Sequence, residues 1–466
     1  MKAPGLKARV ARPRPGATLL TAIAAFALAA LPACGALDLE DALSLAAARS
    51  DEVAIRRAEV AAAKADVALA AALRIVPEAN VTLLLGPAPA AHGNVLQSPD
   101  SNRNPLHQLA PFERVEVSVV QPVFTWGRLD AASEAAEAGT RARSQLLEDQ
   151  LARVQERIVQ LFWGNALARR LLAIAADVDR AMADVDRRVA ESLQRADGSI
   201  TQTDRYRIDH FHGLVRQRTV DAERGRELAR AALAATLALP PERLALKEAS
   251  LDAPEEPIPS AEEARRGAEA RRADLKALGS AVAAQEAKIR AEEAAALPQI
   301  FVAGVFAYSF APNRDIQTNP WVHDYFNELV LGAAVGARQD LAFPLLSAKA
   351  SKARAEMATL ERQRDALRDL VGAEVDVALA DLRAAGDRLA AARATLSSGK
   401  SWFRAAGLDF SAGLIEPREL IDAYTGYVES QVWYAQAAYD LLVARGRLSL
   451  ATAELPRQGE PTCDLQ

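Results

Sequence analysis

Cysteine and histidine are scarce in this chain. Its 466 residues include two cysteines, Cys34 and Cys463, and five histidines. Two cysteines cannot build a disulfide framework. The histidines are scattered, and even the close pair His210 and His212 would point about 200° apart on a helix, too far apart to bind one metal ion without distortion. We therefore expect no disulfide scaffold, no metal site and no cofactor.

Catalytic signatures and long apolar runs are also missing. The sequence holds no Gly-rich phosphate loop and no cluster of catalytic side chains, which disfavours an enzyme. The formal charge of -5 makes nucleic acid a poor partner, because phosphates repel an acidic surface. The mainly apolar stretch at 17–31 has fifteen residues, too few for an ordinary membrane-spanning helix.

Small apolar residues are abundant. Half of the chain is hydrophobic but only 5% is aromatic, so alanine and leucine supply most of the apolar surface. This composition favours helices that pack closely along their length. Prolines are missing from Val123 to Leu239 and again from Leu345 to Glu416, which allows very long helices.

The first 36 residues have the features of a signal peptide. Five basic residues precede the apolar run at 17–31, and small residues follow it. Cys34 lies in "LPACG", which resembles the lipobox of bacterial lipoproteins, although Pro32 departs from the usual pattern. Two alternatives stay open: Cys34 is lipidated, or it is discarded with the signal after cleavage at Ala36.

The rest of the sequence contains an internal repeat. The stretch from Ala48 matches the stretch from Ala270 at an offset of 222, with a one-residue slip near the proline. The same offset pairs Pro122 with Pro344. We therefore predict a tandem duplication, in which each copy has the order helix, strand, loop, strand, long helix, helix. The predicted segments are a first repeat at 37–246, a second repeat at 247–456 and a polar tail at 457–466.

Each repeat is expected to contribute two strands, at 78–86 and 113–123 in the first copy and at 299–310 and 328–343 in the second. In the strand at 113–123 three valines alternate with polar residues, so one face is apolar and the other polar. Eight of the 24 aromatic residues fall between Phe301 and Phe343. This clustering resembles the girdle of an outer-membrane barrel, and the alternative is the aromatic core of a soluble hairpin.

The proline-free segments are expected to form helical hairpins. Leu147, Leu151, Val154 and Ile158 recur at steps of four and three, the spacing of a coiled-coil seam. Helix-breaking stretches at 195–204 and 397–417 are expected to turn each long helix into a returning one.

Four motifs occur in a fixed order: "LDLEDALSLA" after the signal, the strand-to-helix junctions "QPVFTWGR" and "FPLLSAKA", and the turn "GLIEPRELIDA". Together with the duplication, they resemble the TolC-like outer-membrane efflux channel family over roughly Leu37 to Leu455. The resemblance implies an α+β, mainly α fold in which long antiparallel helices form a periplasmic coiled-coil tube. It also implies a homotrimer, in which each protomer gives four strands to one twelve-stranded barrel in the outer membrane of a Gram-negative bacterium.

The function implied by this resemblance is passive conduction. The channel would accept substrate from an inner-membrane efflux pump or secretion ATPase through a periplasmic adaptor, and release it outside. The alternative is a periplasmic adaptor or a structural coiled-coil protein without a pore. An adaptor, however, needs one hairpin flanked by β-rich domains, whereas this sequence has a strand pair in each of two copies.

The resemblance also suggests gate residues. It places an acidic ring or selectivity filter at Glu419 and Asp422, whose i, i+3 spacing lets both carboxylates share one helix face. Around a threefold axis such acids would attract cations, and the alternative is an ordinary solvated helix N-terminus. Asp204 matches an acid of the family's closing ion pair. The basic partner position falls on Ile415, so the contact is either missing or rebuilt through Arg418 or Arg205.

Overall fold

The structure is a computed structural model that describes residues 36–75, 78–92, 108–195, 201–252, 256–316, 321 and 323–454. The expected signal segment before residue 36, with its candidate lipidation site Cys34, lies outside the described residues, as does the polar tail. No helix in the described ranges is long and apolar enough to cross a membrane.

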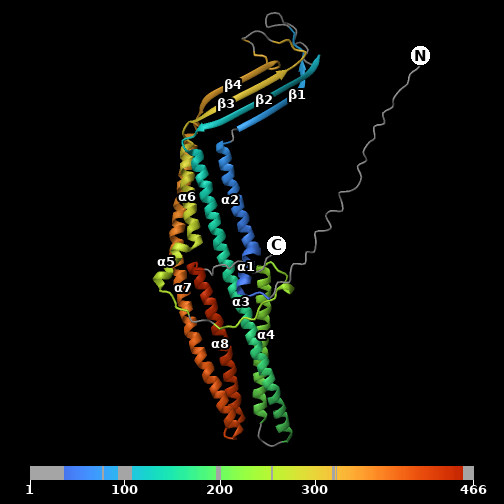
Figure 1. Ribbon diagram of the computed structural model, residues 1–466, viewed down its shortest axis with the longest axis vertical. Helices are drawn as coiled ribbons and strands as arrows, with labels where there is room; N and C mark the ends of the chain where they lie inside the picture. Colours follow the sequence, from blue (N-terminus) through green and yellow to red (C-terminus); the bar gives the residue numbers. More distant parts are fainter. Residues whose placement is uncertain are drawn as a thin grey trace, which may run out of the picture.

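The molecule is elongated, with a four-stranded sheet at one end and long helices running away from it (Figure 1). The four-stranded sheet and the long helices confirm the expected fold class, which is α+β and mainly α. The short helices α1 and α5 lie about halfway along the helical body, and the two hairpin tips lie at the end opposite the sheet (Figure 1). The elements in chain order are α1 Leu39–Arg49, α2 Asp51–Ile75, β1 Glu78–Pro89, β2 Leu109–Phe124, α3 Arg128–Arg195, α4 Gln202–Thr236, the 3-10 turn η1 Pro241–Arg243, α5 Ala261–Arg271, α6 Ala273–Ala294, β3 Gln299–Phe310, β4 Glu328–Arg338, α7 Phe343–Ser411 and α8 Pro417–Thr452.

The sheet is antiparallel throughout, in the order β1-β2-β3-β4. Its register pairs apolar side chains with one another along one set of positions. Leu83 pairs with Val115, Val115 with Tyr308, and Tyr308 with Leu329. Directly paired residues share a face, and successive residues point to opposite faces. One parity of all four strands is therefore almost wholly apolar, while the other carries the polar residues, among them Asn80, Thr82, Arg114, Glu116, Ser118, Ser309 and Glu328.

Several strand details differ from expectation: β1 continues to Pro89, and β2 begins at Leu109 and ends at Phe124. The strand expected at 328–343 ends at Arg338, because Ala342 is the N-cap of α7 and Pro344 occupies its first turn. Pro122 does not end its strand. It lies inside β2, where the pairing with β3 shifts register between Pro122 and Phe124. A proline removes one backbone donor from the ladder, and a bulge is where a sheet tolerates that loss.

The junction from β2 to α3 depends on Gly127. Its φ is +78°, in the left-handed region, and Arg128 begins the helix directly afterwards. Trp126 also has a positive φ, of 55°, and its indole Nε1 donates a hydrogen bond of 2.8 Å to the carbonyl of Pro298. The turn is thereby tied to the residue that precedes β3.

The two halves of the chain correspond element by element. The breaks between the paired helices have the same backbone geometry, with φ and ψ of -57° and 128° at Ser50 and -57° and 126° at Arg272. These positions keep the offset of 222. The hairpins do not keep this offset. Helix α3 begins at Arg128 and its counterpart α7 begins at Phe343, which is an offset of 215. The pairing of Pro122 with Pro344 was therefore wrong, because the first lies in a strand and the second in a helix.

The long helices are nearly equal in the two halves, with 68 residues in α3 and 69 in α7. The returning helices α4 and α8 have 35 and 36 residues. Helix α7 continues to Ser411, so the breaking stretch expected from residue 397 is helical over most of its length. The predicted boundary between the two repeats, at residues 246 and 247, stays a prediction.

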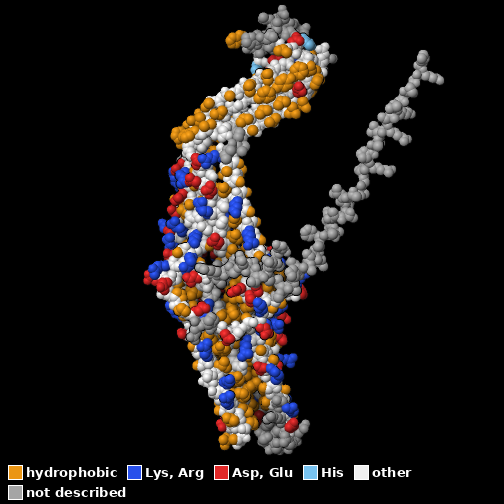
Figure 2. All heavy atoms as spheres, viewed as in Figure 1, with side chains coloured by type: hydrophobic (Ala, Val, Ile, Leu, Met, Phe, Trp, Pro, Cys, Tyr) orange, Lys and Arg blue, Asp and Glu red, His pale blue; other side chains and the backbone are white. Residues whose placement is uncertain are grey.

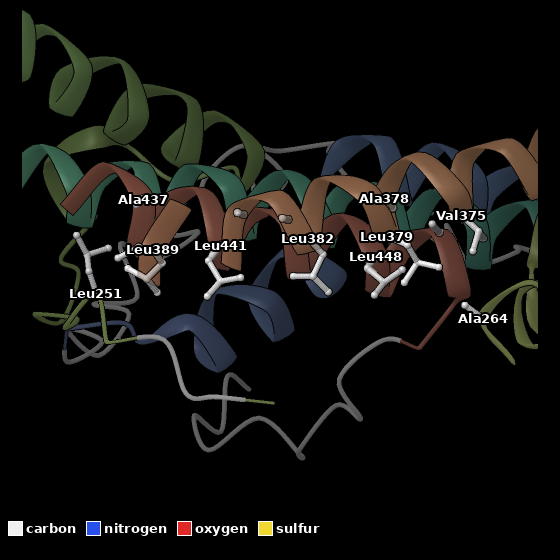
Figure 3. Close-up of a cluster of buried hydrophobic side chains, with 14 of the residues drawn as sticks. Leu251, Ala264, Val375, Ala378, Leu379, Leu382, Leu389, Ala437, Leu441 and Leu448 are labelled. Carbon is white, nitrogen blue, oxygen red and sulfur yellow. The ribbon is translucent and has the colours of Figure 1, made fainter. Parts of the chain in front are cut away.

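The largest apolar core lies where α5, α7 and α8 meet. Leucines of α7 and α8 lie side by side there, with Leu251 at one end of the cluster and Ala264 at the other (Figure 3). A second core packs Leu37 and α1 against α3 and α4. Leu37 also forms a parallel bridge with Leu246. These two cores fix the middle of the helical body.

Close helix contacts depend on glycines that face large neighbours. A Cβ at Gly446 of α8 would lie 2.9 Å from Cγ1 of Val159 in α3, and one at Gly426 would lie 2.8 Å from the Trp402 ring of α7. Both distances are shorter than van der Waals contact, so α8 reaches its present position only because these side chains are absent.

We predict that Gly446→Ala lowers the free energy of unfolding by about 1–3 kcal/mol, because α3 and α8 must separate to admit the methyl group. Gly213→Ala is the matched control, since nothing lies within 4 Å of its added Cβ. It should stabilise α4 by about 0.5–1 kcal/mol through the better helix propensity of alanine. Thermal unfolding of the solubilised protein followed by circular dichroism would measure both changes. Equal effects of the two substitutions would contradict the packing explanation.

Candidate functional site

The apolar face of the sheet is fully available on the described protomer. Leu331 is 85% exposed, Val335 75% and Val81 72%. In the space-filling view apolar side chains dominate the sheet, whereas charged side chains are scattered among apolar ones over the helices (Figure 2). An apolar patch of this extent marks a surface that contacts lipid or another protein.

The polar face of the sheet carries an ion network. The Arg114 guanidinium pairs with Glu328 of β4 and, at 3.2 Å, with Glu116 of its own strand. His323 Nε2 lies 2.8 Å from the second carboxylate oxygen of Glu328. Ser309 donates a hydrogen bond of 2.9 Å to the carbonyl of Tyr325. These contacts join β2, β3 and β4 on the face opposite the exposed leucines and valines.

The predicted acidic residues lie at the hairpin tip. Glu419 is in the first turn of α8, and Asp422 follows one turn later. Both are exposed, and Asp422 lies 3.8 Å from Nε of Arg418. Glu419 forms no ion pair with any described residue of the protomer. Asp422 therefore has a basic partner on its own helix, whereas Glu419 has none among the described residues, and their role as a filter stays a prediction.

Asp204 is the N3 residue of α4, three positions after the N-cap Thr201. It forms a capping box with Thr201, whose hydroxyl donates a hydrogen bond of 2.7 Å to the carboxylate. These hydrogen bonds, strengthened by Arg207 at 3.6 Å, lower the pKa of Asp204 although partial burial opposes the shift. Arg418 pairs with Asp422, and Arg205 pairs with Asp209 at 3.1 Å. Within the described part of the protomer, neither arginine forms an ion pair with Asp204.

The contact between the two hairpins near their tips is apolar. Phe211 of α4 packs edge-on against Tyr424 of α8, with ring centroids 6.2 Å apart. Tyr424 also contacts Phe403 of α7, at 5.1 Å. Burial raises the pKa of the Tyr424 hydroxyl, and the Asp177 carboxylate adds to the shift, so this hydroxyl stays neutral. Ile174, Val178, Met182, Ile208 and Val428 complete the cluster.

Sequence reasoning missed this contact. It looked for a charged pair between the hairpins and aligned its basic position with Ile415, an apolar residue. The available signal was the concentration of aromatic residues at 402–403 and 424–427, of which Tyr424 contacts Phe211 of α4 in the folded chain. Which aromatic residues meet depends on the pairing of helices far apart in sequence.

Asp204→Ala should loosen only the first turn of α4. Losing the cap costs about 1 kcal/mol, so amide hydrogen exchange there should become roughly fivefold faster at neutral pH. Because folding lowers the pKa of Asp204, its contribution is present above the ordinary carboxylate pKa and fades as the pH falls below it. Phe211→Ala should instead speed exchange in α8 around Tyr424. Faster exchange of α8 in the Asp204 variant would show that Asp204 holds the hairpins together.

Comparisons with known proteins agree with this geometry. Residues 265–454 match the family model described as "Outer membrane efflux protein". No curated protein matches the sequence. Among solved structures, the Campylobacter jejuni CmeC outer membrane channel is similar with a TM-score of 0.73 and 14% identity, covering 91% of this chain and 87% of that one.

Two further channels show the same fold. The Neisseria gonorrhoeae MtrE channel, in its open state, has a TM-score of 0.71 and 15% identity, with coverage of 89% and 88%. The OprN outer-membrane channel has a TM-score of 0.70 and 18% identity, with coverage of 89% of both chains. These matches are to channel proteins and not to enzymes. The resemblance to the TolC-like outer-membrane efflux channels is thereby confirmed: the second half of the chain matches the outer membrane efflux protein family, and the chain has the fold of such channels over nine tenths of its length.

Proposed function

We propose that this protein is the outer-membrane channel of a tripartite efflux or type I secretion system and works as a homotrimer. The observation that carries the proposal is the two-faced sheet. Its register collects apolar side chains on one face and the Arg114 network on the other. A wall with lipid outside and water inside needs this separation.

The free edges of the sheet support assembly. Strands β1 and β4 each pair on one side only among the described strands. Unpaired backbone groups cannot be left in lipid, and four strands cannot close a barrel wide enough to conduct solutes. If β4 of one protomer pairs with β1 of the next, three protomers close a barrel of twelve strands.

The helices would continue this barrel as a periplasmic tube. Helices α3 and α7 have 68 and 69 residues, which at about 1.5 Å per residue gives roughly 100 Å. In this arrangement the tips of the hairpins would receive substrate from a periplasmic adaptor and an inner-membrane pump. Transport through the tube would be passive, without a cofactor.

The exposed acids at the tip would form the entrance filter. Glu419 and Asp422 occur once per protomer, so a threefold axis would bring six carboxylates together at the end of the tube. Converging carboxylates favour cations and bind divalent ions, which would block the entrance. Glu419 has no competing ion pair in the described protomer, which leaves its charge available.

A pair of neighbouring substitutions tests the sheet. Leu83 lies on the apolar face and Thr82 on the polar face of β1. Leu83→Lys should cost about 2–4 kcal/mol if its face meets lipid near the membrane centre, and should reduce the heat-modifiable trimer in outer membranes. Thr82→Lys should assemble normally. Equal tolerance of both lysines, or a soluble monomer from the native chain, would favour an adaptor or scaffold without a pore.

Single-channel conductance in planar bilayers tests the filter. Glu419→Ala/Asp422→Ala should reduce cation selectivity and remove block by divalent ions, because the converging charges are lost. Glu262→Ala/Glu269→Ala removes the same number of acids from α5, halfway along the tube, and should leave both properties nearly unchanged. If the tip variant keeps native selectivity and block, the filter lies elsewhere in the channel.

A further inference from the structure

The polar face of the sheet is buried at its outer end, the end far from the helices (Figure 1). Ala307 and Ser309 of β3 are 3% and 2% exposed, and Ala88 of β1 is fully buried. All three belong to the polar face by their strand pairing. Nearer the helices the same face is open, since Asn80 is exposed and Val305 is 37% exposed. Other parts of the chain therefore cover only the outer end of this face.

The covering segment is the connection between β3 and β4, which the structure describes at 311–316, 321 and 323–327. Phe326 of this connection packs edge-on against Phe112 of β2, with ring centroids 5.2 Å apart. Phe112 belongs to the polar face, because it pairs with Gly86 two positions before Arg114. The Arg314 guanidinium lies over the Phe326 ring, 4.0 Å from its centroid. Two aromatic rings and a cation thus anchor the connection to this face.

Hydrogen bonds attach the connection to three strands. The carbonyl of Tyr325 accepts a hydrogen bond of 2.9 Å from the Ser309 hydroxyl and one of 3.5 Å from Arg114. Arg314 Nη1 donates a hydrogen bond of 2.9 Å to the carbonyl of Pro89, at the end of β1. Because β2 lies between β1 and β3, the connection crosses the end of β2 to make this last contact.

The side on which the connection lies decides where it would sit in an assembled barrel. The polar face is the inner face of the proposed barrel, so the connection would lie within the wall and not above it. One connection from each protomer would then narrow the opening at the outer end.

We propose that the β3-β4 connection forms an inward-folded collar at the outer mouth of the channel and restricts the size of the solutes that pass. The collar consists of the described residues of this connection together with Phe112 and Arg114. It rests on the proposed function, because the polar face is an inner face only in a closed barrel. Arg114 is paired with Glu328 and Glu116, so the collar carries charges of both signs and discriminates by size more than by charge.

Modification of a single cysteine tests where the connection lies. Tyr325→Cys places a thiol on the collar, at a side chain that is 64% exposed. Leu329→Cys is the matched control, because Leu329 is 72% exposed but lies on the apolar face. Both variants carry Cys463→Ser, and the chain with Cys463→Ser alone is the background.

A charged methanethiosulfonate reagent, added on the outer side during single-channel recording, should lower the conductance of Tyr325→Cys in up to three steps, one for each protomer. Leu329→Cys and the background should be unaffected. Unchanged conductance of Tyr325→Cys channels whose labelling is confirmed by mass would overturn the collar, while the channel proposal would stand. A native chain that forms no channels would overturn both.

A second experiment measures the restriction itself. Asn80→Cys places a thiol on the open part of the polar face, beyond the collar. A maleimide on a polyethylene glycol chain, added to intact cells, should label this thiol roughly tenfold faster when Phe326→Ser is also present, because the lost ring contacts change the population of undocked connections by about that factor. A small maleimide should label both chains at similar rates.

Phe310→Ser is the control for the loss of an aromatic residue, since Phe310 is at the outer end but on the apolar face. It should leave labelling by the large reagent unchanged. The heat-modifiable trimer checks the assembly of each variant. Equally fast labelling by the large reagent with and without Phe326→Ser would overturn the proposal.

Discussion

The register of four antiparallel strands is the constraint on which the rest of the molecule depends. Because side chains alternate, a slip of one residue between two strands would pair the apolar face of one strand with the polar face of the next. The register is kept by pairing over 11 or 12 residues between neighbouring strands and by the Arg114-Glu328 contact across the sheet. The single irregularity in these pairings lies at the end of β2, next to the helix.

In the helical body, mainly small side chains hold the long helices together. Alanine and glycine let the helices approach closely, and larger apolar residues gather in a few clusters near the middle and the tips. At the break between α5 and α6, the buried Arg272 is held by Asp274 and Glu374. Burial by itself would lower the pKa of Arg272 and raise that of Asp274, but their mutual hydrogen bonds reverse both shifts, so both stay charged.

Much of this fold was predictable from local signals. Alternation predicted the apolar valines of β2, and the absence of proline predicted α3 and α7. Features that depend on distant partners were not predictable in the same way. The expected strand at 113–123 contained Pro122, but only the pairing with β3 reveals the bulge that accommodates this proline. For Asp204 the resemblance left open whether the contact between hairpins is missing or rebuilt, and in the described protomer its carboxylate accepts a hydrogen bond from Thr201 beside its own helix. The Phe211-Tyr424 contact joins residues more than two hundred positions apart.

The change of offset from 222 at the helix breaks to 215 at the hairpins means that the second half has seven fewer residues between these points. The hairpin helices nevertheless differ by only one residue each. The difference in length is therefore confined to the strands with their connecting segments and to helices α2 and α6, which lead into the sheet. Variation in length at the sheet end therefore leaves the reach of the two hairpins almost unchanged, because each hairpin keeps the length of its helices.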